Sequence, residues 1–160
     1  MKIVMGSDHA GFALKQTMAD EVRRAGHEVL DVGAYDTTPS DYPDLAKAAG
    51  EVIQRGEAER GILICGSGVG ASVAANKMRG LRAALITETY SAHQGVEHDD
   101  LNMLCLGSRV VGVALASEIV QAFLGASFQR EERFVRRLNK VLAIEAAMSE
   151  IPGISKTAGV

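Results

Sequence analysis

The chain has 160 residues, 47% of them hydrophobic, and a formal net charge of −3 at pH 7, so it is long enough for one well-packed domain and short for two. The weak charge indicates neither nucleic acid nor a membrane surface as a partner, and no stretch is long and apolar enough to span a membrane. With no secretion signal ahead of the first strand-like segment and only two cysteines, we expect a cytoplasmic protein whose thiols are reduced.

Apolar runs and helical periodicities alternate along most of the chain. Strands are predicted at Lys2–Gly6, Glu28–Val32, Gly61–Cys65, Ala83–Thr87 and Met103–Gly107. The helices between them are predicted to end at Gly26, at Gly56, near Met78 and near His98. This alternation predicts a single-domain α/β fold, a Rossmann-like parallel five-stranded sheet with right-handed connections and helices on both faces.

The remainder of the chain reads as helical. Helices are predicted at Val111–Leu124, where Gly125 stops the first, and at Glu131–Met148. A long terminal helix outside the alternation is expected to be used in dimerisation. Residues 149–160 show little periodicity and are expected to form a flexible tail, which leaves 1–148 as the folded domain.

The most distinctive stretch runs from Gly61 to Met78, GILICGSGVGASVAANKM. A continuous apolar run into Cys65 is typical of a parallel strand buried on both faces. The glycines that follow allow backbone N–H groups to approach a ligand, and these groups with the start of the next helix favour negative charge. Cys65 is expected at the lip of that anion site, where a thiolate is stabilised.

Ligands of open parallel sheets bind beyond the carboxyl ends of the strands. Polar residues expected at those ends are Asp8, His9, Cys65, Ser67, Glu88 and Arg109. Taken singly, each has a structural interpretation: Asp8 can cap its helix, and a strand-end cysteine is commonly core filler. Their convergence on one edge favours a functional site.

The glycine turn has a competing interpretation. Gly66, Gly68 and Ala71 fit the G-x-G-x-x-A pattern of dinucleotide sites, and Glu88 follows about 20 residues later. Two observations argue against a dehydrogenase: the motif follows the third predicted strand instead of the first, and the chain has no room for a separate substrate domain. A non-enzymatic nucleotide-binding module faces neither objection, so it is the alternative from a different class.

Other polar residues are candidates for metal or phosphate binding. His93 and His98 are five apart, which does not place them on one helical face, so no metal site is predicted. Arg133 and Arg137 are one turn apart on the last predicted helix and form either a solvated basic face or a phosphate clamp. Cys105 lies among apolar neighbours and is expected in the core.

Five ordered motifs resemble ribose-5-phosphate isomerase type B and the wider sugar-phosphate isomerase family that includes galactose-6-phosphate isomerase subunits. They are GSDHAGF from Gly6, DYPD from Asp41, CGSGVG from Cys65, AANK from Ala74 and LCLGSRVVG from Leu104. The resemblance implies a cofactor-free aldose–ketose isomerase, most closely of ribose 5-phosphate to ribulose 5-phosphate. It also implies a homodimer, or a dimer of dimers, with active sites shared at the subunit interface.

The resemblance assigns roles to individual residues. Cys65 is the base that moves a proton between C1 and C2, and Ser67 with the turn amides holds the cis-enediolate. His98 opens the sugar ring and Asp8 moves or orients hydroxyl protons. The implied substrate-binding residues are His9, Tyr42, Gly66, Gly68, Val69, Gly70, Asp99, Arg109, Arg133 and Arg137.

One position assigns this chain to a subgroup of the family, and one position and one segment depart from the family pattern. Ala71 stands where another subgroup has a glutamate base, so this chain resembles the cysteine type. Asp99 takes the place of an asparagine that contacts the sugar, which leaves a tetrose 4-phosphate or hexose 6-phosphate as an alternative substrate. The segment from Arg130 to Phe134 replaces a Gly-Gly-Arg-His sequence, so Arg137 aligns more directly than Arg133.

Overall fold

The computed structural model describes residues 1–148. The chain divides into two compact units, residues 1–128 and the residues from 129 onward, and each is described by itself. The flexible tail predicted for 149–160 lies outside the described residues.

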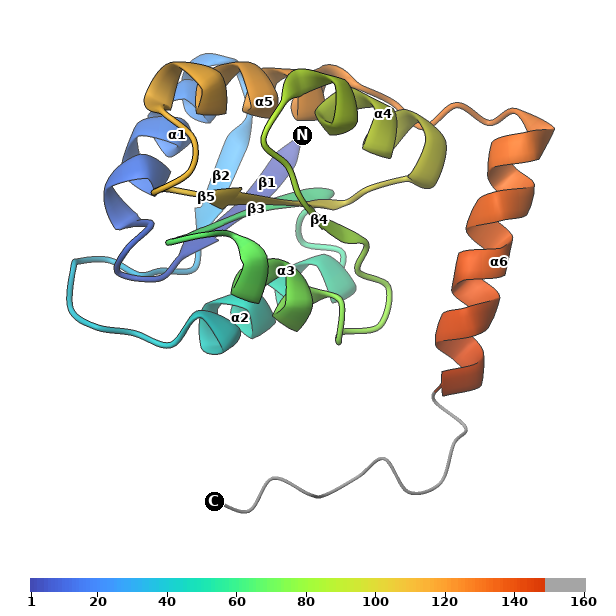
Figure 1. Cartoon of the computed structure of the whole chain (residues 1–160), viewed down its shortest axis with the longest axis horizontal. Helices are drawn as coiled ribbons and strands as arrows, with labels where there is room; N and C mark the ends of the chain where they lie inside the picture. Colours follow the sequence, from blue (N-terminus) through green and yellow to red (C-terminus); the bar gives the residue numbers. More distant parts are fainter. Residues whose placement is uncertain (149–160) are drawn as a thin grey trace. The chain divides into compact units, whose positions relative to one another are not determined.

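The first unit is built around a parallel sheet (Figure 1). Within the described residues its strands are β1 (Lys2–Ser7), β2 (Glu28–Asp31), β3 (Arg60–Cys65), β4 (Ala83–Leu85) and β5 (Met103–Gly107). Its helices are α1 (Phe12–Arg24), α2 (Tyr42–Gln54), α3 (Val69–Ala75), α4 (Thr89–Asp99) and α5 (Val113–Gly125). The strand order is β2-β1-β3-β5-β4, so the predicted five-stranded parallel sheet is confirmed.

The sheet is covered on both faces (Figure 1). Ile3 and Ile62 point into the layer of α1, α4 and α5, whereas Val4 and Leu63 point into the layer of α2 and α3. All four side chains are at most 2% exposed. Successive residues of a strand alternate between faces, and both faces here are buried, so the strands read as unbroken apolar runs rather than alternating ones.

Helix α3 is shorter than predicted, because Asn76 ends it. The Asn76 side-chain amide donates to the carbonyl oxygens of Ser72 (3.0 Å) and Ala83 (2.8 Å). Its oxygen accepts the Ala83 N–H at 2.9 Å. This side chain therefore stops α3 at Ala75, three residues before Met78, and ties the start of edge strand β4 to it.

Unit 2 contains α6 (Glu132–Met148), one residue shorter than predicted. Arg133 lies over the ring of Phe134, 4.4 Å from its centroid, and its Nε donates to Glu131 at 2.9 Å. Val141 and Ile144 are 49% and 66% exposed. This helix thus leaves apolar side chains uncovered within the described chain.

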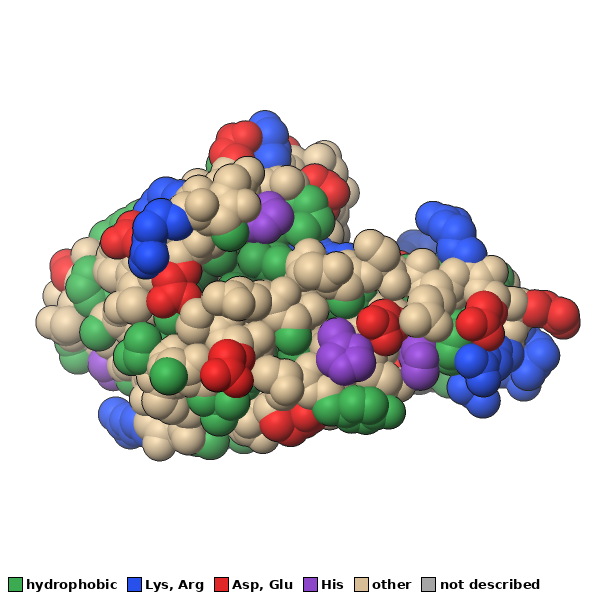
Figure 2. Space-filling model, turned by 90° about the horizontal axis from the view of Figure 1, so that it is seen from above, with side chains coloured by type: hydrophobic (Ala, Val, Ile, Leu, Met, Phe, Trp, Pro, Cys, Tyr) green, Lys and Arg blue, Asp and Glu red, His purple; other side chains and the backbone are tan. Residues whose placement is uncertain are grey.

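The surface of the first unit carries charges of both signs. Figure 2 shows acidic and basic side chains on this surface: α1 carries both signs, whereas α4 and α5 carry acidic residues and no Lys or Arg. Exposed pairs such as Arg23 with Asp20, 3.1 Å apart, contribute about 0.2–1 kcal/mol each, so they have little influence on the fold. Across residues 1–148, no helix combines the length and apolar character that crossing a membrane requires.

Candidate active site

The turn between β3 and α3 points the Cys65 side chain at backbone amides. The Gly68 N–H donates to Cys65 Sγ over 3.1 Å, and the cysteine is only 4% exposed. Gly68 has φ +81°, and a Cβ there would lie 2.9 Å from the carbonyl carbon of Leu106. Only glycine fits such a position without strain. The sulfur therefore faces the turn and accepts a hydrogen bond from it.

A cavity of about 320 Å³ opens at this turn. Its lining residues are Asp8, Tyr42, Cys65, Gly66, Ser67, Gly70, Arg109 and Val110. They follow the carboxyl ends of β1, β3 and β5 or begin α2, as expected for a parallel sheet. Seven of these residues were expected from the sequence, whereas Val110, 57% exposed, was missed although it sits inside the LCLGSRVVG motif.

Ser67 and Val69 complete the turn. The Val69 N–H donates to Ser67 Oγ at 3.3 Å, and Ser67 is exposed at the cavity. The thiol and the hydroxyl thus each accept one amide of the turn. Because α3 has only 7 residues, the individual amides matter more here than the dipole of a long helix.

Asp8 is fixed by the start of α1. Its Oδ1 accepts the Gly11 N–H at 2.9 Å, and the residue is 8% exposed. At Gly11, a Cβ would lie 2.1 Å from the Ile64 carbonyl oxygen, so only glycine permits this close approach of α1 to β3. Asp8 therefore holds the turn that leads into α1 and lines the cavity at once.

His9 is held by Ser40, a residue that sequence reasoning missed. The His9 N–H donates to Ser40 Oγ, and the Ser40 N–H donates to His9 Nδ1, both at 3.1 Å. Because Nδ1 accepts, the ring proton of neutral His9 sits on Nε2. Ser40 lies in the loop just before the DYPD motif, and no local pattern marks it.

Two glycines of the turn make room for larger side chains. The Arg109 guanidinium lies against Gly66, with Cζ 3.7 Å from where a Cβ would be, and the Arg109 N–H donates to the Gly66 carbonyl at 3.0 Å. The Tyr42 ring lies against Gly70, where a Cβ would be 2.6 Å from its Cζ. A cation and an aromatic ring therefore border the thiol.

His98 and Asp99 lie at the other edge of the sheet. They end α4, which runs back from the carboxyl end of β4 towards the start of β5. The neighbouring Asp100 bonds to Arg82, which precedes β4. Within one copy, then, neither residue lines the cavity at Cys65. The Gln94 amide donates to His98 Nδ1 at 2.7 Å. Arg133 and Arg137 belong to the second unit.

Two further candidates have structural roles. The Glu88 carboxylate accepts the Ser91 N–H at 2.9 Å and caps α4, and these hydrogen bonds lower the pKa of Glu88. The acidic residue of the nucleotide hypothesis is thus used as a helix cap. Cys105 is fully buried, as predicted, and burial raises the pKa of its thiol far above its usual value.

The sequence and the structure of this chain are similar to those of known proteins. Residues 3–141 match the model of the family described as Ribose/Galactose Isomerase. The chain is 44% identical over 144 residues to ribose-5-phosphate isomerase B of Escherichia coli, covering 90% of this chain and 96% of that protein. It is 41% identical to D-erythrulose-4-phosphate isomerase 2 of Mycolicibacterium smegmatis, covering 92% and 99%. The structure of Clostridium thermocellum ribose-5-phosphate isomerase B superposes with a TM-score of 0.90 at 46% identity, covering 92% and 99%.

Proposed function

We propose that this chain, which belongs to the Ribose/Galactose Isomerase family, interconverts a phosphorylated aldose and its ketose, with ribose 5-phosphate and ribulose 5-phosphate as the pair. The names of its relatives in Escherichia coli and Clostridium thermocellum support this substrate. The observation that carries the proposal is the Cys65 sulfur, which accepts the Gly68 amide in a cavity bordered by Asp8, Ser67 and Arg109.

The proposed reaction moves one proton along the sugar. Cys65, as a thiolate, takes the proton from C2 of the open-chain aldose, and the electron pair forms the C1=C2 bond of a cis-enediolate. The negative charge falls on oxygen atoms beside the Ser67 hydroxyl, which can donate while its Oγ accepts the Val69 N–H, and beside the turn amides that neither this hydroxyl nor the thiol accepts. Asp8 moves a hydroxyl proton from O2 to O1, and the Cys65 thiol returns its proton to C1. No redox cofactor takes part in this balance.

Cationic and polar groups around the cavity are suited to the phosphate. Arg109 offers forked donors beside the turn, and His9 is oriented with its Nε2 proton outward from the Ser40 contact. Tyr42 lines the cavity and is expected to contact the sugar. Arg133 and Arg137, one turn apart on α6, are proposed to add phosphate contacts.

The proposed assembly is a homodimer, or a dimer of dimers, with shared sites. His98 and Asp99 lie at the sheet edge opposite the cavity of their own copy, so they are proposed to serve the cavity of a second copy. Exposed apolar residues beside the cavity support a covering partner there: Val69, Val73 and Val110 are 51%, 55% and 57% exposed. Helix α6, with Val141 and Ile144 exposed, is proposed to take part in dimerisation. A cytoplasmic location is proposed from the two free thiols.

A second substrate has support of its own. The relative in Mycolicibacterium smegmatis is named for D-erythrulose 4-phosphate, and Asp99 places a carboxylate where family members have an amide. A tetrose 4-phosphate is therefore the second candidate.

Isotope exchange tests the proposal. Isomerisation of ribose 5-phosphate in D₂O is expected to introduce deuterium from solvent, and Cys65→Ala is expected to lower kcat by about 100-fold or more. Cys105→Ala, which removes the other thiol, is the control and keeps most activity. The same assay with tetrose 4-phosphates and hexose 6-phosphates ranks the substrates. A Cys65→Ala variant with parental turnover would refute the cysteine base.

A further inference from the structure

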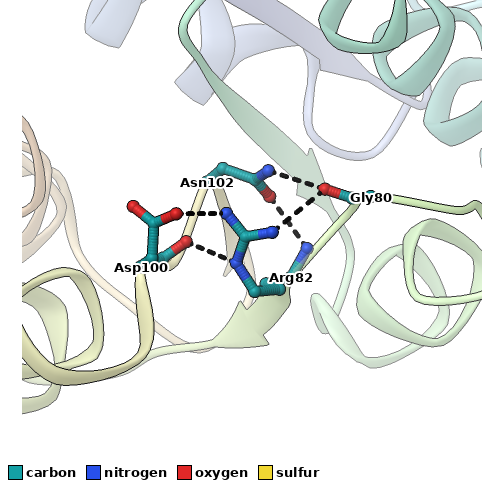
Figure 3. Close-up of polar contacts among 4 residues, drawn as sticks. All are labelled: Gly80, Arg82, Asp100 and Asn102. Carbon is teal, nitrogen blue, oxygen red and sulfur yellow. Dashed lines mark hydrogen bonds and ion pairs between the residues drawn. The ribbon is translucent and has the colours of Figure 1, made fainter. Parts of the chain in front are cut away.

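The carboxyl end of α4 is held by a hydrogen-bonded network that the reaction scheme above does not use (Figure 3). Arg82 Nε donates to the Asp100 carbonyl oxygen at 2.6 Å, and its Nη2 donates to Asp100 Oδ2 at 2.7 Å. One guanidinium therefore binds both the backbone and the side chain of the residue that ends the helix. Such forked, charge-assisted donation fixes orientation as well as distance.

Asn102 closes the network on its other side (Figure 3). Its Oδ1 accepts the Arg82 N–H at 2.8 Å, and its Nδ2 donates to the Gly80 carbonyl at 2.9 Å. Arg82 Nη1 also donates to that carbonyl at 3.3 Å. The Arg82 side chain is only 19% exposed, so these bonds are shielded from competing water better than a surface pair.

The network supports an unfavourable backbone conformation. Asp100 has φ +52°, the one non-glycine residue with positive φ in the described chain. Its N–H donates to the Val96 carbonyl at 3.2 Å, which ends α4. A left-handed residue outside glycine needs local support, although aspartate tolerates it better than most residues. The two bonds from Arg82 supply that support.

The two residues just before Asp100 are Asp99 and His98. His98 lies in the last turn of α4, with its Nδ1 accepting from Gln94. The Gln94 contact orients the imidazole relative to the helix. The anchoring of the helix end by Arg82 adds to the core packing of Ala92 and Val96 in orienting it relative to the sheet. Helix ends fray readily when they are not anchored.

We infer that Arg82 is a positioning residue for the isomerase: through Asp100 it holds His98 in the place from which it opens the sugar ring. This inference rests on the proposed function and on the ring-opening role that the family resemblance implies for His98. Arg82 itself touches no reacting atom in the scheme. Its loss is expected to be local, because the network joins only the starts of β4 and β5 to the end of α4, and β4 is an edge strand.

A double-mutant cycle on ribose 5-phosphate separates positioning from general damage. Arg82→Gln is expected to lower kcat about tenfold when His98 is present and less than about twofold in a His98→Asn background, since a residue that acts through His98 loses its effect with it. Arg82→Lys keeps the charge without the fork and is expected to fall between the parent and Arg82→Gln. Arg55→Gln, which breaks an exposed ion pair with Glu57, is the matched control and leaves kcat unchanged.

Two further readouts accompany the cycle. A tetrose 4-phosphate cannot close a furanose ring because its O4 carries the phosphate, so its turnover is expected to change less than twofold in Arg82→Gln, roughly within assay scatter. Hydrogen exchange at the amides of Asp100 and Leu101, which bond to Val96 and Gly95, is expected to speed up about tenfold or more.

Opposite results overturn the inference. Equal losses of kcat in both His98 backgrounds, or no loss in either, show that Arg82 does not act through His98. A parent protein inactive on all sugar phosphates, or a His98→Asn variant with parental kcat on ribose 5-phosphate, instead contradicts the proposed function. The parent and His98→Asn measurements alone therefore tell the two failures apart.

Discussion

The backbone N–H of Gly68 points at the sulfur of Cys65, 3.1 Å away. Gly68 has φ +81°, a conformation that only glycine adopts without strain. Strand β3 positions the Cys65 thiol, and the left-handed Gly68 in the turn positions the N–H that donates to it. The site therefore depends on backbone conformation as directly as on side-chain chemistry.

Replacing this glycine should lower the free energy of unfolding. Gly68→Ala places a Cβ 2.9 Å from the Leu106 carbonyl carbon and forces a left-handed alanine, so we expect a loss of about 1–3 kcal/mol in the free energy of unfolding. Urea denaturation measures it. Gly56→Ala is the control: φ is +71° there, but nothing lies within 4 Å of its Cβ, so only the smaller backbone strain applies. Equal losses in both variants would show that the close contact does not matter.

The two thiols should differ in reactivity. Cys65 lines the cavity, whereas Cys105 is fully buried and the pKa of its thiol is raised by burial. Iodoacetamide is expected to alkylate Cys65 alone in the folded protein and both thiols after unfolding. Mass spectrometry of the peptides measures which thiol is labelled. A sugar phosphate that occupies the cavity should slow the reaction at Cys65. Rapid labelling of Cys105 in the folded protein contradicts its placement in the core.

Burial of Cys105 also implies a dependence of stability on pH. Its folded-state pKa lies above the ordinary value of 9.0, so the unfolded chain loses the thiol proton first as pH rises. This contribution to stability is present below about pH 9 and is lost at higher pH. Between pH 8 and pH 10, the free energy of unfolding should fall less for Cys105→Ala than for the parent, as measured by urea denaturation. Equal falls in the two proteins would contradict a contribution of Cys105 to the pH dependence.

The contact between Ser40 and His9 should affect substrate binding more than chemistry. Ser40→Ala removes the hydroxyl that accepts the His9 N–H, while the Ser40 N–H can still donate to Nδ1. We expect KM for ribose 5-phosphate to rise about threefold to tenfold with kcat nearly unchanged. Thr37→Ala, in the same loop, is the control. A loss confined to kcat would argue against a binding role for His9.

Lys15 is a buried cation whose loss should be costly. Its ammonium contacts Asp31 and donates to the Ala34 carbonyl at 2.8 Å, and the residue is 0% exposed. Lys15→Met removes the cation paired with the Asp31 carboxylate, which still accepts the Gly33 N–H, and we expect the protein to lose about 3 kcal/mol or more of unfolding free energy. Lys47→Met removes a lysine from an exposed pair with Glu51 and should change stability by less than about 1 kcal/mol.

Asp99 should influence substrate preference. A carboxylate near an anionic sugar phosphate disfavours binding, and an amide does not. Asp99→Asn is therefore expected to raise kcat/KM for ribose 5-phosphate, with the gain largest at low ionic strength. Asp36→Asn, in an exposed loop, is the control for the change in net charge. An unchanged or lower kcat/KM would place Asp99 away from the substrate.

Local patterns were enough to predict the sheet and the core of the site. Each strand is a short apolar run, and most of the turns carry a glycine, so neighbouring residues determine them. Because the carboxyl ends of parallel strands meet at one edge of the sheet, Asp8, Cys65 and Arg109 are predicted to lie together without knowledge of any side-chain contact. The sequence by itself thus determined seven of the eight residues that line the cavity at the thiol, all but Val110.

Long-range contacts were decided only by the tertiary structure. Ser40 meets His9 across 31 residues, and Arg82 meets Asp100 across 18, and neither pair has a local signature. The resemblance assigned His98 to a site shared between subunits without saying which copy supplies it, and only the fold puts the end of α4 at the edge opposite the cavity of the same copy. Such pairings depend on how the helices cross the sheet, which local periodicity does not encode.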